Sequence, residues 1–293
     1  MNIGKKIKAL RCEKFMTQSE LAGNEITRNM LSRIENGAAQ PSLDTLRYLA
    51  RRLNVSAGFL LAEDGDEQIY LKNAEIRGIK KAFIGEDYRI CRDICKKSDS
   101  VDDDEIQMIL AECNLAIGIE EFNRGNLRAS CEYLDEAIEG CGKTFYRTDS
   151  IVATAGIYFR YMRRLSATLS SNIIDEGEVN IYPSMTDEFC RYAYVLDLKD
   201  RKIDVPFGDQ ENFRKTNSPF FLHLEAMRLM EEERYEEAYK NLKEILLGDI
   251  SIPEPMMYFL FCDLEICCRE IQDFRGAYEY SIDKIELLQK LLV

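Results

Sequence analysis

The sequence predicts an all-α protein with two parts, a small basic module of five helices and a longer acidic stack of helix pairs. Five short segments within residues 1–62 carry apolar residues at helical spacing, with capping residues at their starts. Residues 1–62 hold ten Lys or Arg and five Asp or Glu, a net charge of +5, so the remainder carries −18. After that module a helix-pair pattern recurs along the chain. We therefore expect one domain over residues 1–65 and a second over residues 66–293.

Composition restricts the class of protein further. Hydrophobic residues make up 46% of the chain and charged residues 31%, as in a globular protein. No apolar run approaches the roughly 20 residues that span a bilayer, and the first 15 residues contain no apolar stretch typical of a secretion signal. We expect no membrane contact, a cytoplasmic location and reduced thiols for the ten cysteines.

The five helices of the first module are delimited by local signals. Thr17 and Glu20 have the spacing of a capping box, Thr27 is a good N-cap, and Gly37 suits a left-handed helix stop. These signals predict helices at residues 3–15, Gln18–Ala22, Thr27–Ile34, from Pro41-Ser42 through Leu53, and Ser56–Leu61.

The run TQSELA–ITRNMLSRIENG–PSLDTLRYLARRLNV resembles the helix-turn-helix domain of lambdoid phage repressors, the XRE family. The resemblance covers residues 3–62, and it departs from the family in a turn one residue shorter between Ala22 and Ile26. It implies a five-helix lambda-repressor-like fold whose third helix enters the major groove of double-stranded DNA.

Docking of the third helix assigns candidate DNA contacts. Arg28 and Asn29 project from its first turn and Arg33 lies one turn further on. Arginine can bridge guanine O6 and N7, and asparagine can bridge adenine N6 and N7. The alternative is that these side chains are solvated surface.

Three more residues are expected at the sugar-phosphate backbone. Gln18 opens the second helix, where a phosphate contact is favoured over a base contact. By resemblance, Thr27 and Asn36 are backbone contacts too, although Thr27 already has a capping role. Lys6 is expected to lie away from the groove and to matter little.

The second part shows four units of one pattern, in which a helix, a short turn and an apolar residue precede a second helix. The apolar residues after the turns are Tyr88, Leu127, Tyr235 and Phe274, and the first and last pairs of these are each 39 residues apart. The longer middle gap leaves room for two helix pairs built from Ile151–Leu169 and Met185–Leu198. The pattern resembles tetratricopeptide repeats, whose usual period is about 34 residues.

Stacked helix pairs form an α-solenoid with an extended concave face, which the first helix of each pair lines. This rule gives Asn114, Glu121, Phe122, Tyr158, Tyr161 and Arg164 as candidate ligand contacts. Asparagine can pair with a peptide backbone, and arginine can hold a terminal carboxylate. The alternative is that the tyrosines pack between repeats and Arg164 pairs with a surface acid.

The chain offers little for catalysis, so we expect no enzyme activity, no cofactor and no metal. His223 is the only histidine and sits at the spacing of a partly buried packing residue. Cys91 and Cys95, and Cys262, Cys267 and Cys268, lack the spacing of zinc knuckles and suit tight helix packing better than metal or redox roles. The acids from Asp102 to Glu105 are expected to favour a helix N-terminus rather than to bind calcium.

A basic DNA reader joined to such repeats resembles the Rgg/PlcR class of peptide-pheromone-sensing regulators of low-GC Gram-positive bacteria. The resemblance implies a transcription regulator that binds an operator as a homodimer and responds to a signalling peptide in quorum sensing. Two alternatives remain open. The repeats could bind a partner protein and no small ligand, or the chain could sequester a signalling protein, with DNA binding vestigial.

Overall fold

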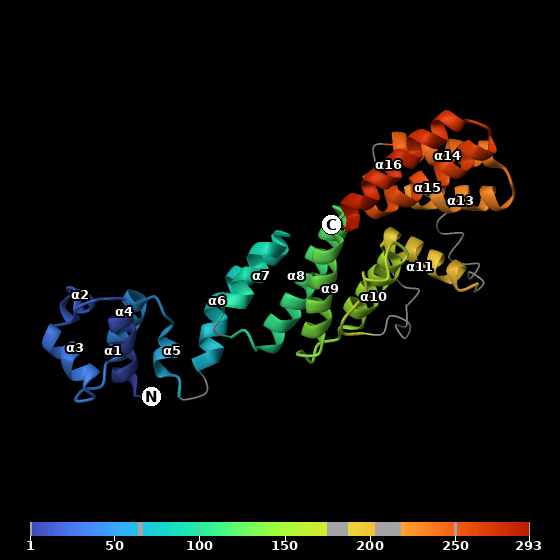
Figure 1. The fold of residues 1–293 in the computed structure, drawn as a ribbon. Coiled ribbons are helices and arrows are strands. Elements are labelled where there is room, and N and C mark those ends of the chain that lie inside the picture. The colour runs from blue at the N-terminus through green and yellow to red at the C-terminus, as the bar shows by residue number, and fades with distance from the viewer. Residues whose placement is uncertain are drawn as a thin grey trace. The chain divides into compact units, whose positions relative to one another are not determined.

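The computed structural model describes residues 2–63, 67–98, 100–174, 187–202, 218–248 and 251–292. Within these ranges the regular secondary structure is helical, which confirms the all-α prediction (Figure 1). The chain divides into two compact units, Met1–Asp103 and Asp104–Val293. The first unit holds α1 to α7 and the second holds α8 to α16. The expected domain boundary after residue 65 stays a prediction.

The first five helices follow the predicted order closely. They are α1 (Ile3–Glu13), α2 (Gln18–Ala22), α3 (Arg28–Glu35), α4 (Leu43–Leu53) and α5 (Ala57–Leu61). Thr17 and Glu20 form the predicted capping box on α2. α1 ends two residues earlier than expected, and Phe15 follows it with a positive φ of 54°.

One apolar core joins these five helices. Ile7, Leu31, Leu49 and Leu60 are fully buried in it, and each comes from a different helix. Gly4 lies where α1 crosses the end of α3, and a Cβ there would collide with the carbonyl oxygen of Ile34. The position of α3 against α1 therefore depends on the missing side chain at residue 4.

Lys6 has a structural role that the sequence analysis did not identify. It is only 2% exposed, and its Nζ donates to the carbonyl oxygens of Ala62 and, at 3.4 Å, Phe59. The ammonium group also lies 5.7 Å from the centroid of the Phe59 ring. Lys6 thus satisfies carbonyl groups at the end of α5, which a periodicity argument cannot reveal because the partners lie more than fifty residues away in sequence.

The next two helices, α6 (Glu67–Ile84) and α7 (Tyr88–Lys97), form the first helix pair and belong to the same compact unit. The ring of Tyr70 on α6 lies directly against Gly58 of α5. Cys91 and Cys95 on α7 are fully buried, and the Sγ atom of Cys91 lies 3.5 Å from the carbonyl oxygen of Ile79 on α6. Both cysteines therefore pack between the helices, as predicted.

The second unit contains further helix pairs. They are α8 (Asp104–Asn123) with α9 (Leu127–Cys141), α10 (Asp149–Arg163) with α11 (Glu188–Asp200), α13 (Pro219–Glu231) with α14 (Tyr235–Leu247), and α15 (Glu254–Glu270) with α16 (Phe274–Leu292). Asp104 and Glu105 lie in the first turn of α8, as predicted for this acidic run.

The four predicted turns are confirmed, and the middle of the repeat series lies partly outside the described residues. Each of the four post-turn residues is the first residue of the second helix of its pair. Between Leu127 and Tyr235 the described residues contribute one helix pair, α10 with α11, and the second expected pair stays a prediction. α10 ends at Arg163 and not at Leu169, and Met185 lies outside the described residues. The physical reason is that the chain after Arg163 turns to pack on α9, where Asp135 accepts hydrogen bonds from Ser171 and Asn172.

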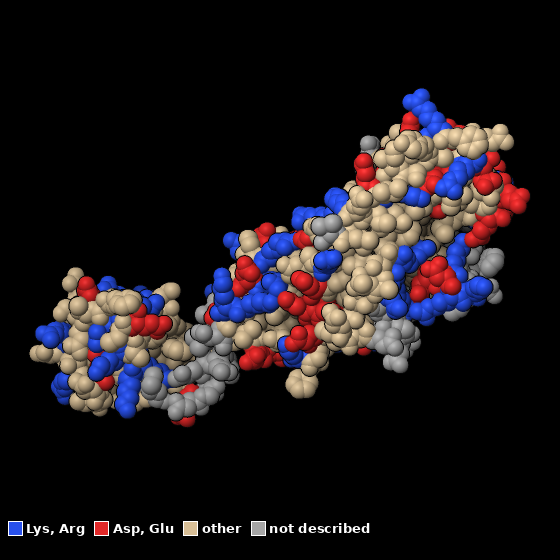
Figure 2. Space-filling model, viewed as in Figure 1, with Lys and Arg blue, Asp and Glu red and all other residues tan. Residues whose placement is uncertain are grey.

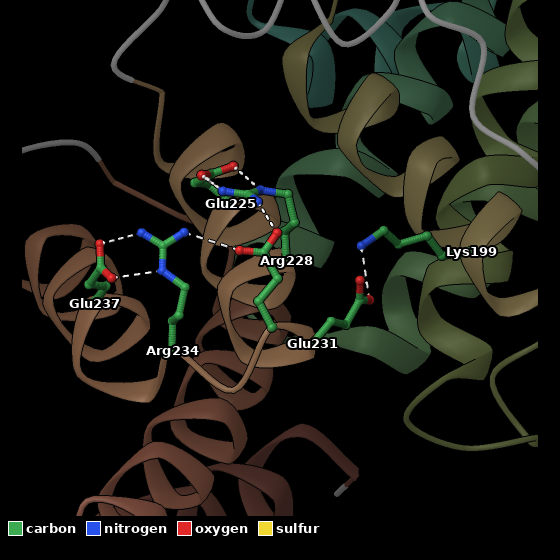
Figure 3. A network of polar contacts seen from close by, with 7 residues as sticks. Lys199, Glu225, Arg228, Glu231, Arg234 and Glu237 are labelled. Carbon is green, nitrogen blue, oxygen red and sulfur yellow. Dashed lines mark hydrogen bonds and ion pairs between the residues drawn. The ribbon is translucent and has the colours of Figure 1, made fainter.

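Several ion pairs lie on the surface of α13 and α14 (Figure 3). Arg228 donates to both oxygens of Glu225 at 3.0 and 2.6 Å, and also pairs with Glu232. Arg234 bridges Glu232 to Glu237, with nitrogen–oxygen distances of 3.1 and 2.7 Å. A separate pair, Lys199 with Glu231, ties α11 to α13 at 3.3 Å. Because these side chains are largely exposed, the pairs contribute little to stability.

The close approach at Gly4 yields a stability test. Gly4→Ala should lower the free energy of unfolding of the first five helices by roughly 2–3 kcal/mol, because the added methyl group meets backbone that cannot rotate away. Gly78→Ala is the matched control, since nothing lies within 4 Å of a Cβ at that α6 position. The control should be stabilising by about 0.5–1 kcal/mol. Hydrogen exchange of the α1 and α3 amides in both variants measures the difference, and a Gly4→Ala protein as protected as wild type would contradict it.

Candidate nucleic-acid interface

α3 presents an exposed polar edge and a buried apolar edge. The Thr27 hydroxyl oxygen accepts a hydrogen bond of 3.1 Å from the backbone nitrogen of Met30, which fixes the first turn. Leu31 and Ile34 are buried in the domain core, as predicted. Arg28, Asn29 and Arg33 are exposed. The helix is therefore anchored by one edge and leaves the side chains expected to contact bases in solvent.

A buried carboxylate holds α3 against α1 and α2. Glu35 is 3% exposed, and its two oxygens accept hydrogen bonds from Arg11 on α1 at 2.7 and 3.1 Å. The Gln18 amide on α2 donates to the same carboxylate at 2.8 Å. Burial alone would raise the pKa of Glu35, but the bonds from Arg11 and Gln18 together with the Arg11 charge outweigh it and hold the pKa below its usual value. Glu35 is thus a charged junction among three helices.

Sequence reasoning missed Arg11 and Glu35 as determinants of the interface. No local signal marks them, because they lie 24 residues apart and charged residues recur throughout α1 and α3. A second pair of contacts fixes α2 from the other side. The Tyr48 hydroxyl on α4 donates to the carbonyl oxygen of Ala22 at 2.9 Å, and Arg52 donates to that of Glu20.

The expected phosphate contacts differ in their placement. Gln18 is half-buried, and its amide nitrogen is already bound to Glu35. Thr27 and Asn36 are exposed at the two ends of α3, as its N-cap and C-cap. The DNA-binding roles of all six residues, Gln18, Thr27, Arg28, Asn29, Arg33 and Asn36, stay predictions.

The candidate ligand contacts of the repeats lie mostly in the core. Asn114, Glu121, Phe122, Tyr158 and Tyr161 are each at most 8% exposed, whereas we expected side chains available on a concave face. Phe122 packs edge-on against Tyr158, with ring centroids 4.8 Å apart, and against Tyr161 at 5.8 Å. Glu121 accepts a hydrogen bond of 2.6 Å from the Asn126 amide. In this conformation the five side chains pack helices together, and their ligand role stays a prediction.

Arg164 is the member of that set with a partly exposed side chain. Its Nε lies 3.1 Å from Asp200, and its guanidinium group stacks 4.8 Å from the ring centroid of Phe259. An arginine held between a carboxylate and an aromatic face keeps its planar donors oriented. Arg164 is therefore the best-placed residue of the six to meet a ligand carboxylate.

His223 does more than fill space in the core. It is 2% exposed, its Nδ1 lies 2.6 Å from the Tyr192 hydroxyl, and its Nε2 lies 2.8 Å from Asp263. This chain of hydrogen bonds joins α11, α13 and α15. The sequence showed a packing residue but not these partners, which come from separate helices.

Burial raises the pKa of several cysteine thiols. It raises the pKa of Cys95 and of Cys267, each to about 12. Thiols in this state are neutral and unreactive at neutral pH. Among the described residues no group of three or more His, Cys, Asp or Glu side chains is arranged to hold a metal ion. No described helix is long and apolar enough to cross a membrane.

Comparison with known proteins identifies the class of the first module. Residues 7–60 match the family model for the helix-turn-helix. A curated relative, the immunity repressor protein of Bacillus phage phi105, is 33% identical over 85 residues, which are 28% of this chain. The chain spans 59% of the length of that relative.

Solved structures of similar length were also found. Bacillus thuringiensis PlcR in complex with the peptide PapR7 and DNA is 14% identical, with coverage of 99% and 96% of the two chains and a TM-score of 0.23. The apo form of the competence regulator ComR from Streptococcus vestibularis is 20% identical, with coverage of 97% and 91% and a TM-score of 0.20. ComR from S. thermophilus, in complex with DNA and its signalling peptide ComS, is 16% identical, with coverage of 98% and 99% and a TM-score of 0.24.

The Glu35 junction can be tested by removing one partner. Arg11→Met should destabilise α3 by roughly 3–5 kcal/mol, because it leaves a buried carboxylate without its charge partner. The exposed pair of Arg275 and Glu279 supplies the control, and Arg275→Met should cost less than about 1 kcal/mol. Hydrogen exchange of the α3 and α16 amides reports each effect. Equal effects of the two substitutions would show that burial of Glu35 contributes nothing special.

Proposed function

We propose that this chain is a sequence-specific DNA-binding transcriptional regulator without catalytic activity, acting in the cytoplasm. The main support for this proposal is the exposed edge of α3. Arg28, Asn29 and Arg33 lie on this edge, and the domain core and the Glu35 junction hold the helix in place. A helix whose backbone is already held in place does not have to be ordered on binding, which favours recognition by direct contact.

The proposed reading of DNA follows from this edge. The N-terminal turn of α3 faces base edges in the major groove, where Arg28 and Arg33 each suit guanine and Asn29 suits adenine. Thr27 and Asn36 contact phosphates from the two ends of the helix. Gln18 contacts a phosphate only if its amide is shared with or released from Glu35.

Substitution of the arginines tests this reading. Arg28→Ala and Arg33→Ala should each weaken operator binding by roughly 1–3 kcal/mol and relax the preference at one or two base pairs. Arg51→Ala is the control, because Arg51 is exposed near the far end of α4. Selection of binding sites from random duplexes, followed by fluorescence anisotropy, measures both effects. Wild-type affinity and sequence preference in both variants would refute the docking.

We propose further that the regulator binds its operator as a homodimer. A single helix-turn-helix module buries little DNA, so typical specific affinities need two modules together. The selected operator should then be a palindrome with half-sites about 10 base pairs or a multiple apart. Sedimentation on and off DNA checks the stoichiometry. One protein per operator at saturation would exclude the dimer.

The resemblance to the Rgg/PlcR class supports a peptide signal bound by the repeats. Asn114, Glu121, Phe122, Tyr158, Tyr161 and Arg164 stay the proposed contacts, with Arg164 as the first point of contact for a peptide carboxylate. Because the other five are buried, their participation requires the aromatic cluster to open.

A peptide bound through its carboxylate gives a sharp test. Thermal-shift screening of short synthetic peptides identifies a ligand, and calorimetry then compares wild type with Arg164→Ala and Asn114→Ala. Arg164→Ala, or amidation of the peptide terminus, should each weaken binding by roughly 1.5–3 kcal/mol. Arg201→Ala is the control, as Arg201 is an exposed arginine paired with Asp197. Equal affinities throughout would remove Arg164 from the site.

The burial of five of the six residues favours a second candidate. In that candidate the repeats bind a partner protein through their outer surface and no small ligand. Failure of wild type to bind any peptide in the screen, with operator binding intact, would support this candidate over the sensor.

A further inference from the structure

The charge of the chain falls into three parts rather than two. Residues 1–62 carry +5, the short segment 63–66 carries −3, and residues 98–293 carry −18. Between them, residues 67–97 hold eight Lys or Arg and five Asp or Glu, a net charge of +3. This middle stretch is the helix pair α6–α7, so the first pair of the repeat series is basic while the rest of the series is acidic.

The positive charge of this pair lies on its surface. α7 carries Arg89, Arg92, Lys96 and Lys97 against a single acid, Asp93. Its buried edge consists of Cys91 and Cys95, which face α6. The basic residues occupy the remaining faces, where Arg92 is half-buried and the other three are exposed. On α6, Arg77, Lys80 and Lys81 are exposed as well, and Figure 2 shows blue side chains gathered over both helices.

The pair belongs physically to the DNA-reading module. α6 and α7 lie in the same compact unit as the first five helices, with Tyr70 packed against Gly58 of α5. Arg89, Arg92 and Lys96 follow one another at intervals of three and four residues, so they line one side of α7. Ion pairs that such residues make with neighbouring acids at an exposed surface contribute little, and phosphates can replace those acids.

We propose that the outer surface of α6 and α7 binds the DNA sugar-phosphate backbone beyond the base pairs read by α3. This inference rests on the proposed DNA-binding function and extends the contacted duplex past the helix-turn-helix module. The contacts are electrostatic and independent of sequence, because flexible basic side chains meet phosphates and no base edge. They strengthen binding and its salt dependence without altering the sequence that is selected.

The experiment compares two duplexes that carry the same operator, selected from random sequences by the wild-type protein. One duplex ends at the selected site, and the other extends it by about two helical turns, roughly 20 base pairs, on each side. The variant Arg89→Gln/Arg92→Gln/Lys96→Gln removes three positive charges and keeps side chains that favour helix. The matched control, Arg124→Gln/Arg128→Gln/Lys143→Gln, makes the same charge change at three exposed sites: Arg124 just after α8, Arg128 on α9 and Lys143 just after α9.

Wild type should bind the long duplex more tightly than the short one. The α7 variant should lose this difference while keeping wild-type affinity for the short duplex. Log affinity falls with log salt concentration, and each lost phosphate contact makes this fall less steep by about 0.9. The loss of three contacts should therefore reduce the steepness by about 2.7. The control variant should behave as wild type on both duplexes.

Three results would overturn the proposal. Wild type could bind the two duplexes with equal affinity, or the α7 variant could bind both duplexes more weakly by the same factor. The control variant could also lose its preference for the long duplex. A second variant, Arg77→Gln/Lys81→Gln on α6, guards against a folding defect in the first and should reduce the same long-duplex advantage. Wild type that selects no duplex at all would refute the DNA-binding function itself, whereas a selected operator without a flank effect refutes only this inference.

Discussion

The carboxylate of Glu35 is the contact on which the helix-turn-helix module depends. It receives the guanidinium group of Arg11 and the amide of Gln18, so one buried charge connects α1, α2 and α3. A buried carboxylate without partners is costly, so the folded state requires all three helices to be in place together. The exposed edge of α3 inherits its orientation from this requirement, since apolar contacts alone allow a helix to slide or rotate.

A cluster of packed aromatic rings lies at the centre of the second unit. Phe122, Tyr158, Tyr161, Phe189 and Tyr192 form a continuous set of ring contacts across α8, α10 and α11. His223 and Asp263 extend this set as a polar chain from Tyr192. Rings packed edge to face admit few alternative arrangements, so this cluster makes the middle of the unit dense. Phe122, Tyr158 and Tyr161, which we expected to contact a peptide, are buried because they belong to this cluster.

Local physics made much of the fold predictable. Thr17, Thr27 and Gly37 act within a few residues of themselves, and their capping and stop roles were read from the sequence alone. The turns before Leu127 and Tyr235 were found in the same way.

Contacts between distant segments were beyond such reasoning. The structural role of Lys6 was missed because its partners lie near Ala62, far away in the sequence. Arg164 and Tyr161 could not be told apart because periodicity does not distinguish a core face from a groove. The sequence contains the basic residues of α6–α7, but we did not notice their excess because the net charge was counted over all residues after 62 together.

Lys6 and Arg11 have a joint structural consequence. Both lie on α1, about 7.5 Å apart along its axis. Lys6 donates hydrogen bonds to the end of α5, against which Tyr70 of α6 packs. Arg11 pairs with Glu35 of α3. α1 therefore contacts both α5, on which α6 rests, and α3, so one helix connects the start of the repeats to the helix with the exposed basic edge.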